Sequence, residues 1–201
     1  LDGALGAPWM LNGSYVFSWA PDPEGWLWDP DNGGGFFNEN ACHLFDAVCY
    51  LLGEPVSVMA EGINPMGMPS EHAAALTIRF DSGAIAALTV GGIGAGAFHA
   101  FPRIDVIAEH GQARLTGRDH IWEQIRWARR DQKATRHLTL PPEALGATRY
   151  TAAFRHFFEC LRTGTSPSAS VADGVRAVAL ATAVYASARS GERVILGDWN
   201  V

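Results

Sequence analysis

The sequence predicts an α+β fold in which an open, mostly antiparallel β-sheet carries helices packed on one face. Strand-length runs follow one another through the middle of the chain and are separated by tight turns such as Asp81-Ser82-Gly83. Consecutive hairpins of this kind build antiparallel sheets. Helix-length segments lie near the start and at the end of the chain. Because one helical layer covers only one face of a sheet, we expect the other face to be wet or docked to a partner.

Composition limits the kinds of protein this chain could be. Its 201 residues are 48% hydrophobic and 18% charged, which fits one globular domain with a sizeable core. A net charge of −6 argues against a nucleic-acid partner. The uncharged stretch 82–102 holds five glycines and a terminal proline, so we interpret it as strand plus loop rather than a membrane span. Three cysteines without metal-site spacing favour reduced thiols and a cytoplasmic location.

The elements are predicted in order along the chain. A first strand over 8–18 leads into a turn-rich loop, 20–32, which carries Trp26 and Trp28. These tryptophans could stack on a ligand or pin the loop to the core, and both readings stay open. A helix is predicted over 33–53. Strands are then predicted over 56–63, 72–81, 84–90, 103–109, 112–116, 120–130 and 134–140.

Two helices and a short strand are predicted to close the chain. The first helix spans 148–163 and carries apolar residues at helical spacing, and the second begins at the capping-box-like Ser170-Val171-Ala172-Asp173 and ends at Gly191. We expect the second helix to bury Val171, Val175, Val178, Ala179, Tyr185 and Ala186. A final strand is expected over 194–196.

The helix over 33–53 carries one stripe of ionisable residues on an otherwise apolar segment. Glu39, His43, Asp46 and Tyr50 are spaced 4, 3 and 4 apart, which places them on one side of a helix. Since the other sides are apolar, we expect the stripe to be partly buried and to form a site. An imidazole can take a proton from an alcohol, and a carboxylate one turn away can orient it.

Two other readings of the same stripe stay open. Glu39 and His43 could form a simple surface ion pair, and Glu39, His43 and Asp46 could bind a divalent metal, which we rate lower because no further ligands are evident. Gly34 and Gly35 would let a substrate or cofactor approach the backbone closely. The pattern G-x-G-x-x-A at 92–97 matches a dinucleotide fingerprint in text only, because no helix is predicted to follow it.

The pattern GGG-x3-acid-x3-His-x2-Asp, from Gly33 to Asp46, resembles the signature of the glucose–fructose oxidoreductase/inositol dehydrogenase/rhizopine-catabolism (Gfo/Idh/MocA) family. The closing segment is similar to the end of the same family, from Tyr150 through Asp173-Gly174 to Tyr185, Ser187-Ala188-Arg189 and Gly191. Two departures are Glu39, where the family usually has Asp, and Ala41, where many members have Gly.

The resemblance implies a C-terminal, substrate-binding domain of an NAD(P)-dependent oxidoreductase that acts on a sugar, inositol or related polyol. The N-terminal dinucleotide-binding domain would lie outside these 201 residues, so the chain alone is expected to be inactive and to bind no cofactor. Its open sheet face would form a homo-oligomer. His43, with Glu39, would be catalytic, and we expect no metal. Candidate substrate contacts are Asn38, Asp46, Trp26, Trp28 and Tyr150. The alternative is a non-catalytic binding or oligomerisation module with the same fold.

Overall fold

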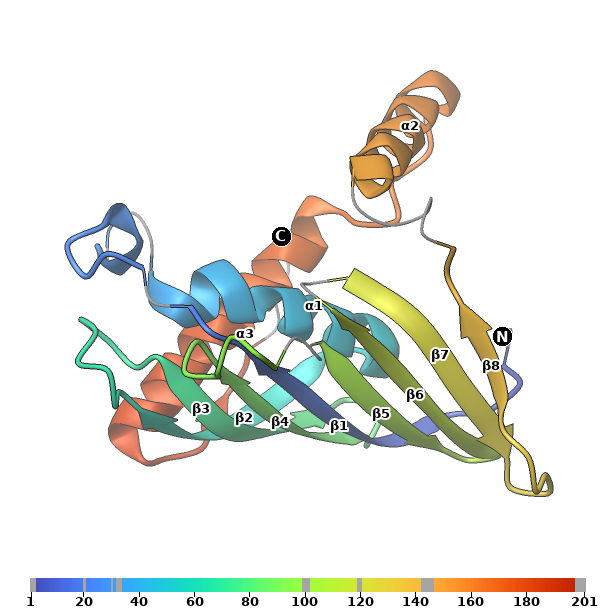
Figure 1. The fold of residues 1–201 in the computed structure, drawn as a ribbon, viewed down its shortest axis with the longest axis horizontal. Coiled ribbons are helices and arrows are strands. Elements are labelled where there is room, and N and C mark those ends of the chain that lie inside the picture. The colour runs from blue at the N-terminus through green and yellow to red at the C-terminus, as the bar shows by residue number, and fades with distance from the viewer. Residues whose placement is uncertain are drawn as a thin grey trace.

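Alternating side chains define the strands of the sheet. In β3 (Ala73–Phe80) Ala74, Leu76, Ile78 and Phe80 are buried and residues 75, 77 and 79 between them are exposed, while Ala73 at the start of the strand is buried as well. A computed structural model of the chain describes residues 3–19, 21–29, 31, 34–98, 102–118, 121–141 and 147–197, with 147–149 as backbone alone. Within these residues the strands form a single sheet (Figure 1).

The sheet has the order β8-β7-β6-β5-β1-β4-β3-β2-β9. The other strands are β1 (Pro8–Val16), β2 (Pro55–Ile63), β4 (Ile85–Gly91), β5 (Arg103–Ala108), β6 (Gly111–Arg118), β7 (Ile121–Arg129), β8 (Arg136–Thr139) and β9 (Val194–Ile195). The three predicted hairpins, β3–β4, β5–β6 and β7–β8, are confirmed. One pairing was not predicted: β1 lies between β4 and β5 and runs parallel to β4.

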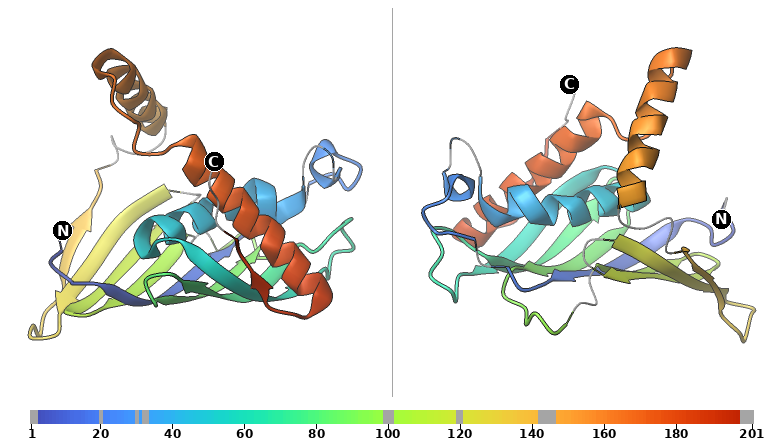
Figure 2. Two further views of the ribbon diagram at one scale, coloured as in Figure 1. Left: turned by 180° about the vertical axis from the view of Figure 1, so that it is seen from behind. Right: turned by 45° about the horizontal axis from the view of Figure 1, so that its top comes forward.

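Two helices cover one face of the sheet. The helix α1 (Cys42–Leu52) packs on β1, and α3 (Val171–Ser190) packs on β2 and on α1 (Figure 2). Between these helices and the sheet lies the core, with fully buried Leu11, Phe36, Phe45, Val48 and Leu180. Within the described residues the opposite face carries no helix (Figures 1 and 2), which confirms the predicted arrangement of an open sheet with helices on one side.

The buried side of α3 differs from the predicted one. Val171, Val178 and Ala186 are exposed, whereas the helix buries mainly small residues together with larger ones: Ala177, Leu180, Ala181, Ala183, Val184, Tyr185 and Ser187. The small residues let α3 lie close to β2 and α1 at once. By length and composition α3 could also cross a membrane, but its buried residues belong to this core.

The helix α2 (Ala147–Thr163) stands away from the rest of the molecule. It rises on the side of the sheet that carries α1 and α3, and both figures show it projecting outward (Figures 1 and 2). Among the described residues it packs against no other helix or strand to any substantial extent.

Candidate functional site

A short π-helix brings the chain into α1. Gly34 and Gly35 have φ values of +70° and +80°, and the backbone then enters a π-helix, Phe37–Ala41, that continues directly into α1. The buried rings of Phe36 and Phe37 anchor this entry in the core. Single π-turns inserted in helices occur often at functional sites. The sequence predicts a helix here but gives no sign of the π-turn.

Tyr185 of α3 fixes the start of the π-helix. Its hydroxyl accepts a hydrogen bond from the Phe37 N–H at 3.1 Å, and its ring centroid lies 4.4 Å from that of Phe37. Burial raises the pKa of Tyr185, so the hydroxyl stays protonated and neutral. The Arg189 guanidinium covers the same ring at 5.2 Å. The helix that carries the polar stripe is therefore fixed to α3.

The two glycines before the π-helix are packed against the protein's own side chains. A Cβ on Gly35 would collide with the Tyr185 hydroxyl, and a Cβ on Gly34 would collide with the amide of Asn38. The Asn38 Nδ2 donates a hydrogen bond to the Gly34 carbonyl at 3.1 Å. Glycine is therefore required here by local packing, and close approach of a cofactor at Gly34 and Gly35 stays a prediction.

The predicted stripe lies on the outer side of α1. Glu39 is half-buried, whereas His43, Asp46 and Tyr50 are exposed, Tyr50 by 79%. The helix turns Leu44, Phe45, Val48, Cys49 and Leu52 toward the sheet and α3. The expectation that the stripe is partly buried is therefore wrong for its last three residues, because in this chain no described element covers the outer side of α1.

Glu39 sits in the most enclosed part of the stripe. The amide Nδ2 of Asn40, which is 8% exposed, donates a hydrogen bond to Glu39 Oε2. The Cys42 thiol donates to the Glu39 carbonyl at 3.5 Å, and burial together with the Glu39 charge raises the pKa of Cys42 to about 11. Burial chiefly, with Cys42 and Glu39, also raises the pKa of Tyr15 at the end of β1.

These contacts add residues that the sequence analysis did not single out. Asn40 orients the Glu39 carboxylate, and Tyr15 and Cys42 line the inner side of the same region as neutral groups. Asn40 follows Glu39 directly, which is the one signal in the sequence. Tyr15 comes from a different strand, so only the fold brings it near.

Asp46 belongs to a different set of charges. Burial and the nearby Asp173 raise its pKa, while Arg176 and His43 lower it. Arg176 of α3 forms ion pairs with Asp173 and Glu54. Asp46 therefore interacts with His43 on one side and with the start of α3 on the other.

Glu39, His43 and Asp46 do not converge on a metal position. Among the described residues there is no group of three or more His, Cys, Asp or Glu side chains placed to hold a metal ion. The geometry therefore gives no support to the metal reading of the stripe.

The three aromatic residues that were predicted to contact a substrate lie in different surroundings. Trp28, in the 3₁₀ turn Trp26–Trp28, packs edge-on against buried His72 with ring centroids 5.7 Å apart, so it pins the loop to the core. Trp26 is 67% exposed at the loop surface. Tyr150 lies on the projecting helix α2 and is 57% exposed.

The glycine pattern at 92–97 does not form a nucleotide site. The strand β4 ends at Gly91, Ile93 makes an isolated bridge to Ser18, and a turn follows. No helix begins at this pattern within the described residues up to 98. Without a helix N-terminus, no backbone dipole faces a pyrophosphate.

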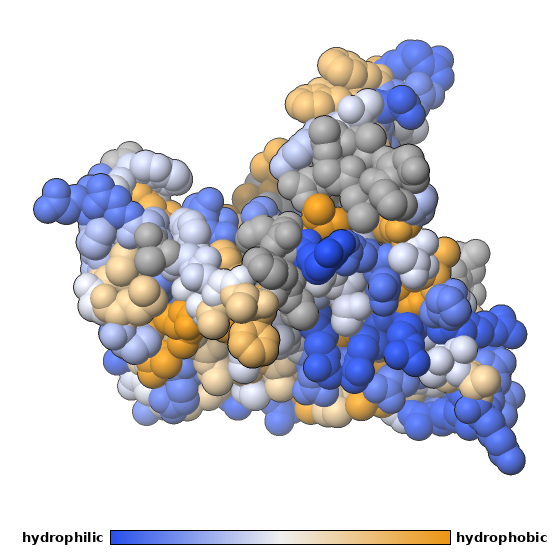
Figure 3. Space-filling view, in the orientation of Figure 1, coloured by the Kyte–Doolittle hydropathy of each residue, from blue (hydrophilic) through white to orange (hydrophobic). Residues whose placement is uncertain are grey.

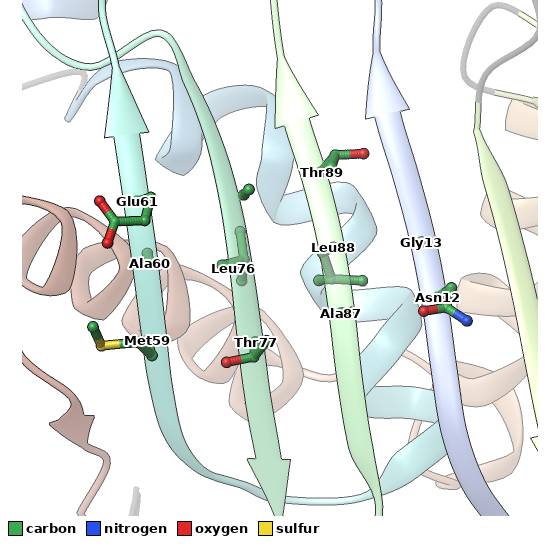
Figure 4. Close-up of a pocket in the computed structure, with 11 residues that line it drawn as sticks. Asn12, Gly13, Met59, Ala60, Glu61, Leu76, Thr77, Ala87, Leu88 and Thr89 are labelled. Atoms are coloured by element: carbon green, nitrogen blue, oxygen red, sulfur yellow. The ribbon is translucent and has the colours of Figure 1, made fainter.

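A shallow hollow lies on the open face of the sheet, across the sheet from α1. It measures about 530 Å³, and small side chains, Ala75, Thr77, Ala87 and Thr89, form its floor (Figure 4). Glu61 and Met59 on β2 and Asn12 on β1 stand at its sides. The hollow contains one carboxylate and no histidine, so it offers little acid–base chemistry.

Comparison with known proteins agrees with the fold. A family model described as the GFO/IDH/MocA C-terminal domain matches residues 1–114. Levoglucosan dehydrogenase in complex with NADH and L-sorbose superposes with a TM-score of 0.83 at 21% identity, over 98% of this chain and 60% of that one. The aldose-aldose oxidoreductase from Caulobacter crescentus in complex with glycerol gives 0.79 at 25% identity, over 97% and 57%.

A third solved structure, an oxidoreductase from Agrobacterium radiobacter in complex with NAD+, L-tartaric acid and magnesium, gives a TM-score of 0.76 at 20% identity, over 96% of this chain and 58% of that one. A comparison with curated proteins found no match. The chain thus spans about 60% of the length of the solved structures it resembles.

The family match over residues 1–114 and the shared open sheet with its helical layer define the class of this chain, a C-terminal domain of the GFO/IDH/MocA type. The chain belongs to the Gfo/Idh/MocA family, as the pattern around His43 predicts.

Proposed function

We propose that this chain is the substrate-binding domain of an NAD(P)-dependent oxidoreductase that acts on a sugar, inositol or related polyol. The observation that carries the proposal is the position of His43 on the outer side of α1, one helical turn after a carboxylate that Asn40 holds in place. The similar folds of proteins crystallised with NADH and sugars support it. In the family resemblance, His43 and Glu39 occupy the catalytic positions.

His43 would act on the proton of the substrate hydroxyl. In the oxidation direction its imidazole would accept the hydroxyl proton as the C–O bond becomes a carbonyl, and bound oxidised NAD(P) would supply the acceptor for the hydride from the same carbon. Glu39 would orient the imidazole or bind a neighbouring hydroxyl group. Asn38, Asp46, Trp26, Trp28 and Tyr150 are proposed substrate contacts; Asp46 belongs to the stripe itself, and Asn38 directly precedes Glu39.

The cofactor would be held mainly by a domain outside these residues. Within the described residues, the side chains of Asn38 and Tyr185 pack against Gly34 and Gly35, and no helix begins at the 92–97 pattern. Neither place therefore provides a cradle for the phosphates of a dinucleotide. We accordingly propose that the isolated chain has no dehydrogenase activity. The choice between NAD and NADP would be made by the other domain.

Replacing His43 tests the proposed function. In the full-length protein, His43→Ala should lower kcat by about 100-fold or more, since general acid–base groups contribute about 10²- to 10⁴-fold. Binding of NADH, measured by fluorescence, should be unchanged. The matched control is His110→Ala, which removes an exposed histidine in the β5–β6 turn. Equal loss in both variants, or full activity of His43→Ala, would contradict the assignment and favour a non-catalytic module.

We also propose that the open face forms a homo-oligomer in the cytoplasm. The hollow in Figure 4 has a floor of small side chains that would let a second sheet approach closely. Positive and negative charges lie apart on this face. Arg103, Arg114 and Arg126, on β5, β6 and β7, surround the buried Asp105, whereas Glu61 lies on β2. A two-fold axis near β4 would place the arginines of one copy over Glu61 of the other. The three free thiols support the cytoplasmic location.

A further inference from the structure

The π-turn before α1 depends on a contact from outside its own helix. The turn, Phe37–Ala41, holds one residue more than an α-helical turn, and turns of this kind are rare. The N–H groups in the first turn of a helix have no acceptor within the helix itself. The Phe37 N–H is such a group, and Phe37 is fully buried. The start of the turn therefore needs an acceptor from another part of the chain.

The acceptor is the Tyr185 hydroxyl, which comes from α3, 148 residues later in the chain. Two further contacts fix the Tyr185 ring, the Phe37 ring at a centroid distance of 4.4 Å and the Arg189 guanidinium at 5.2 Å. Arg189 in turn pairs with Glu71, with 3.3 Å between Nη2 and Oε2, and Ser70 hydrogen-bonds the Tyr185 side chain. The hydroxyl is therefore held both by α3 and by the segment that leads into β3.

The π-turn sets the direction of Glu39 relative to His43. In a continuous α-helix two residues four apart lie one above the other. The extra residue of the π-turn rotates Glu39 out of this line. Glu39 is half-buried and accepts a hydrogen bond from Asn40, whereas His43 is exposed. This difference in their surroundings begins at the turn that Tyr185 holds.

The contact between Tyr185 and Phe37 lies inside the molecule. Tyr185 is 7% exposed and Phe37 is fully buried. The chain enters α1 in the left half of Figure 1, whereas a large hydrophilic area in Figure 3 lies at the lower right, over β6–β8. Removing the Tyr185 hydroxyl therefore changes an internal contact and leaves the charged surface as it is.

We propose that Tyr185 is a positioning residue for the reaction at His43: by holding the Phe37 N–H it keeps the π-turn in place and so sets the Glu39 carboxylate against the His43 imidazole. The inference rests on the proposed function, in which Glu39 orients the imidazole. Tyr185 acts through the backbone at Phe37 and takes no part in the proton transfer itself. Because a displacement of about 1 Å in a catalytic group can cost on the order of 100-fold in rate, this hydrogen bond bears directly on turnover.

Tyr185→Phe tests the proposal, because it removes the hydroxyl and keeps the ring. In the full-length protein, with the sugar or inositol that the wild type turns over fastest, it should lower kcat by about tenfold and change KM by less than about twofold. The loss falls on kcat because the imidazole is present but poorly oriented in the transition state. The Phe37 amide, now without its acceptor, should exchange with solvent at least about tenfold faster than in the wild type.

Two further variants separate positioning from a general loss of stability. Ser187→Ala removes another buried hydroxyl of α3, one that accepts the Ala60 N–H of β2 at 2.9 Å, and should leave kcat within about twofold of the wild type. In a Glu39→Ala background, Tyr185→Phe should lower kcat no further, because the carboxylate that Tyr185 positions is already gone.

The outcomes separate this inference from the proposed function. An unchanged kcat in Tyr185→Phe despite faster exchange at Phe37 would overturn the inference. An equal loss of kcat in Ser187→Ala, or the full tenfold loss in the Glu39→Ala background, would overturn it too. Full activity of His43→Ala would instead contradict the proposed function. Exchange at Phe37 would in that case still report the contact with Tyr185, so the two failures are distinguishable.

Discussion

His72 is buried in the core, and within the described part of the chain neither of its ring nitrogens has a hydrogen-bond partner. It is fully inaccessible and is enclosed by the rings of Trp19, Trp28 and Phe36 at centroid distances of 5.2 to 6.1 Å. Burial lowers its pKa below the ordinary 6.5. The imidazole is therefore neutral in the folded state and takes up a proton in acid only when the protein unfolds.

This residue predicts a loss of stability in mild acid. As pH falls below 6.5, His72 binds a proton more readily in the unfolded chain than in the folded one. The free energy of unfolding therefore falls by up to about 1.4 kcal/mol per pH unit. Urea unfolding of His72→Leu at pH 7 and pH 5 should show a smaller loss than the wild type. His110→Leu, at an exposed position, should retain the wild-type pH dependence. Parallel pH curves for His72→Leu and wild type would contradict the assignment.

At the scale of single residues, the sequence predicts which residues form the stripe better than it predicts how far each of them is buried. Helical spacing alone places Glu39, His43, Asp46 and Tyr50 on one side of α1. Their burial depends on which element covers that side of the helix, and the helical spacing of the residues gives no information about that. Asn40 and Tyr15 were missed for a related reason, since the π-turn sets the Asn40–Glu39 hydrogen bond and strand pairing brings Tyr15 close.

The helix α3 shows what a helical pattern can and cannot reveal at the scale of an element. Its capping box, Ser170 with Asp173, and its left-handed Gly191 end were both readable in the sequence. Its buried side was not, because alanines and valines occur all around the helix and α3 contacts both β2 and α1. The prediction that this helix buries Val171, Val178 and Ala186 is therefore wrong.

Ser187 connects α3 to the sheet through a buried hydroxyl. Its Oγ accepts the Ala60 N–H of β2 at 2.9 Å and donates to the Glu192 carbonyl at 2.7 Å. Ser187→Ala leaves both groups unpaired and should lower the free energy of unfolding by about 1–3 kcal/mol in a urea titration. Thr182→Ala, at an exposed position where the hydroxyl donates to the Val178 carbonyl of its own helix, should stay within about 0.5 kcal/mol of wild type. Similar losses in both would show that Ser187 makes no special contribution.

For the sheet as a whole, the sequence predicts the hairpins but not the order of the strands. Adjacent strands with tight turns pair with each other, so β3–β4, β5–β6 and β7–β8 follow from local sequence. The position of β1 between β4 and β5 depends on contacts between residues far apart in the chain. No local pattern encodes such pairing, and the single parallel pair, β1–β4, was accordingly missed.

The open face makes a prediction about the size of the assembly. Ala87 lies on the floor of the hollow, so Ala87→Arg should place a bulky charge where a second sheet would pack and convert an oligomer to a monomer in light scattering. Thr182→Arg, on the exposed side of α3 in the opposite layer, should leave the mass unchanged. A monomeric wild type at high concentration, or an Ala87→Arg variant of unchanged mass, would contradict assembly through this face.

The strand β1 comes before the other strands of the sheet in the chain, yet it lies in the middle of the sheet. Met10 pairs with Ile85 on one side and with Ile107 on the other. During synthesis β1 therefore emerges long before either partner, whereas the β3–β4 hairpin can close as soon as its turn appears. Contacts over such separations slow folding, and an unpaired strand edge invites pairing with other chains. Until β4 has been made, the nascent chain therefore carries an unpaired strand that later becomes the centre of the sheet, and a chaperone could protect it during this interval.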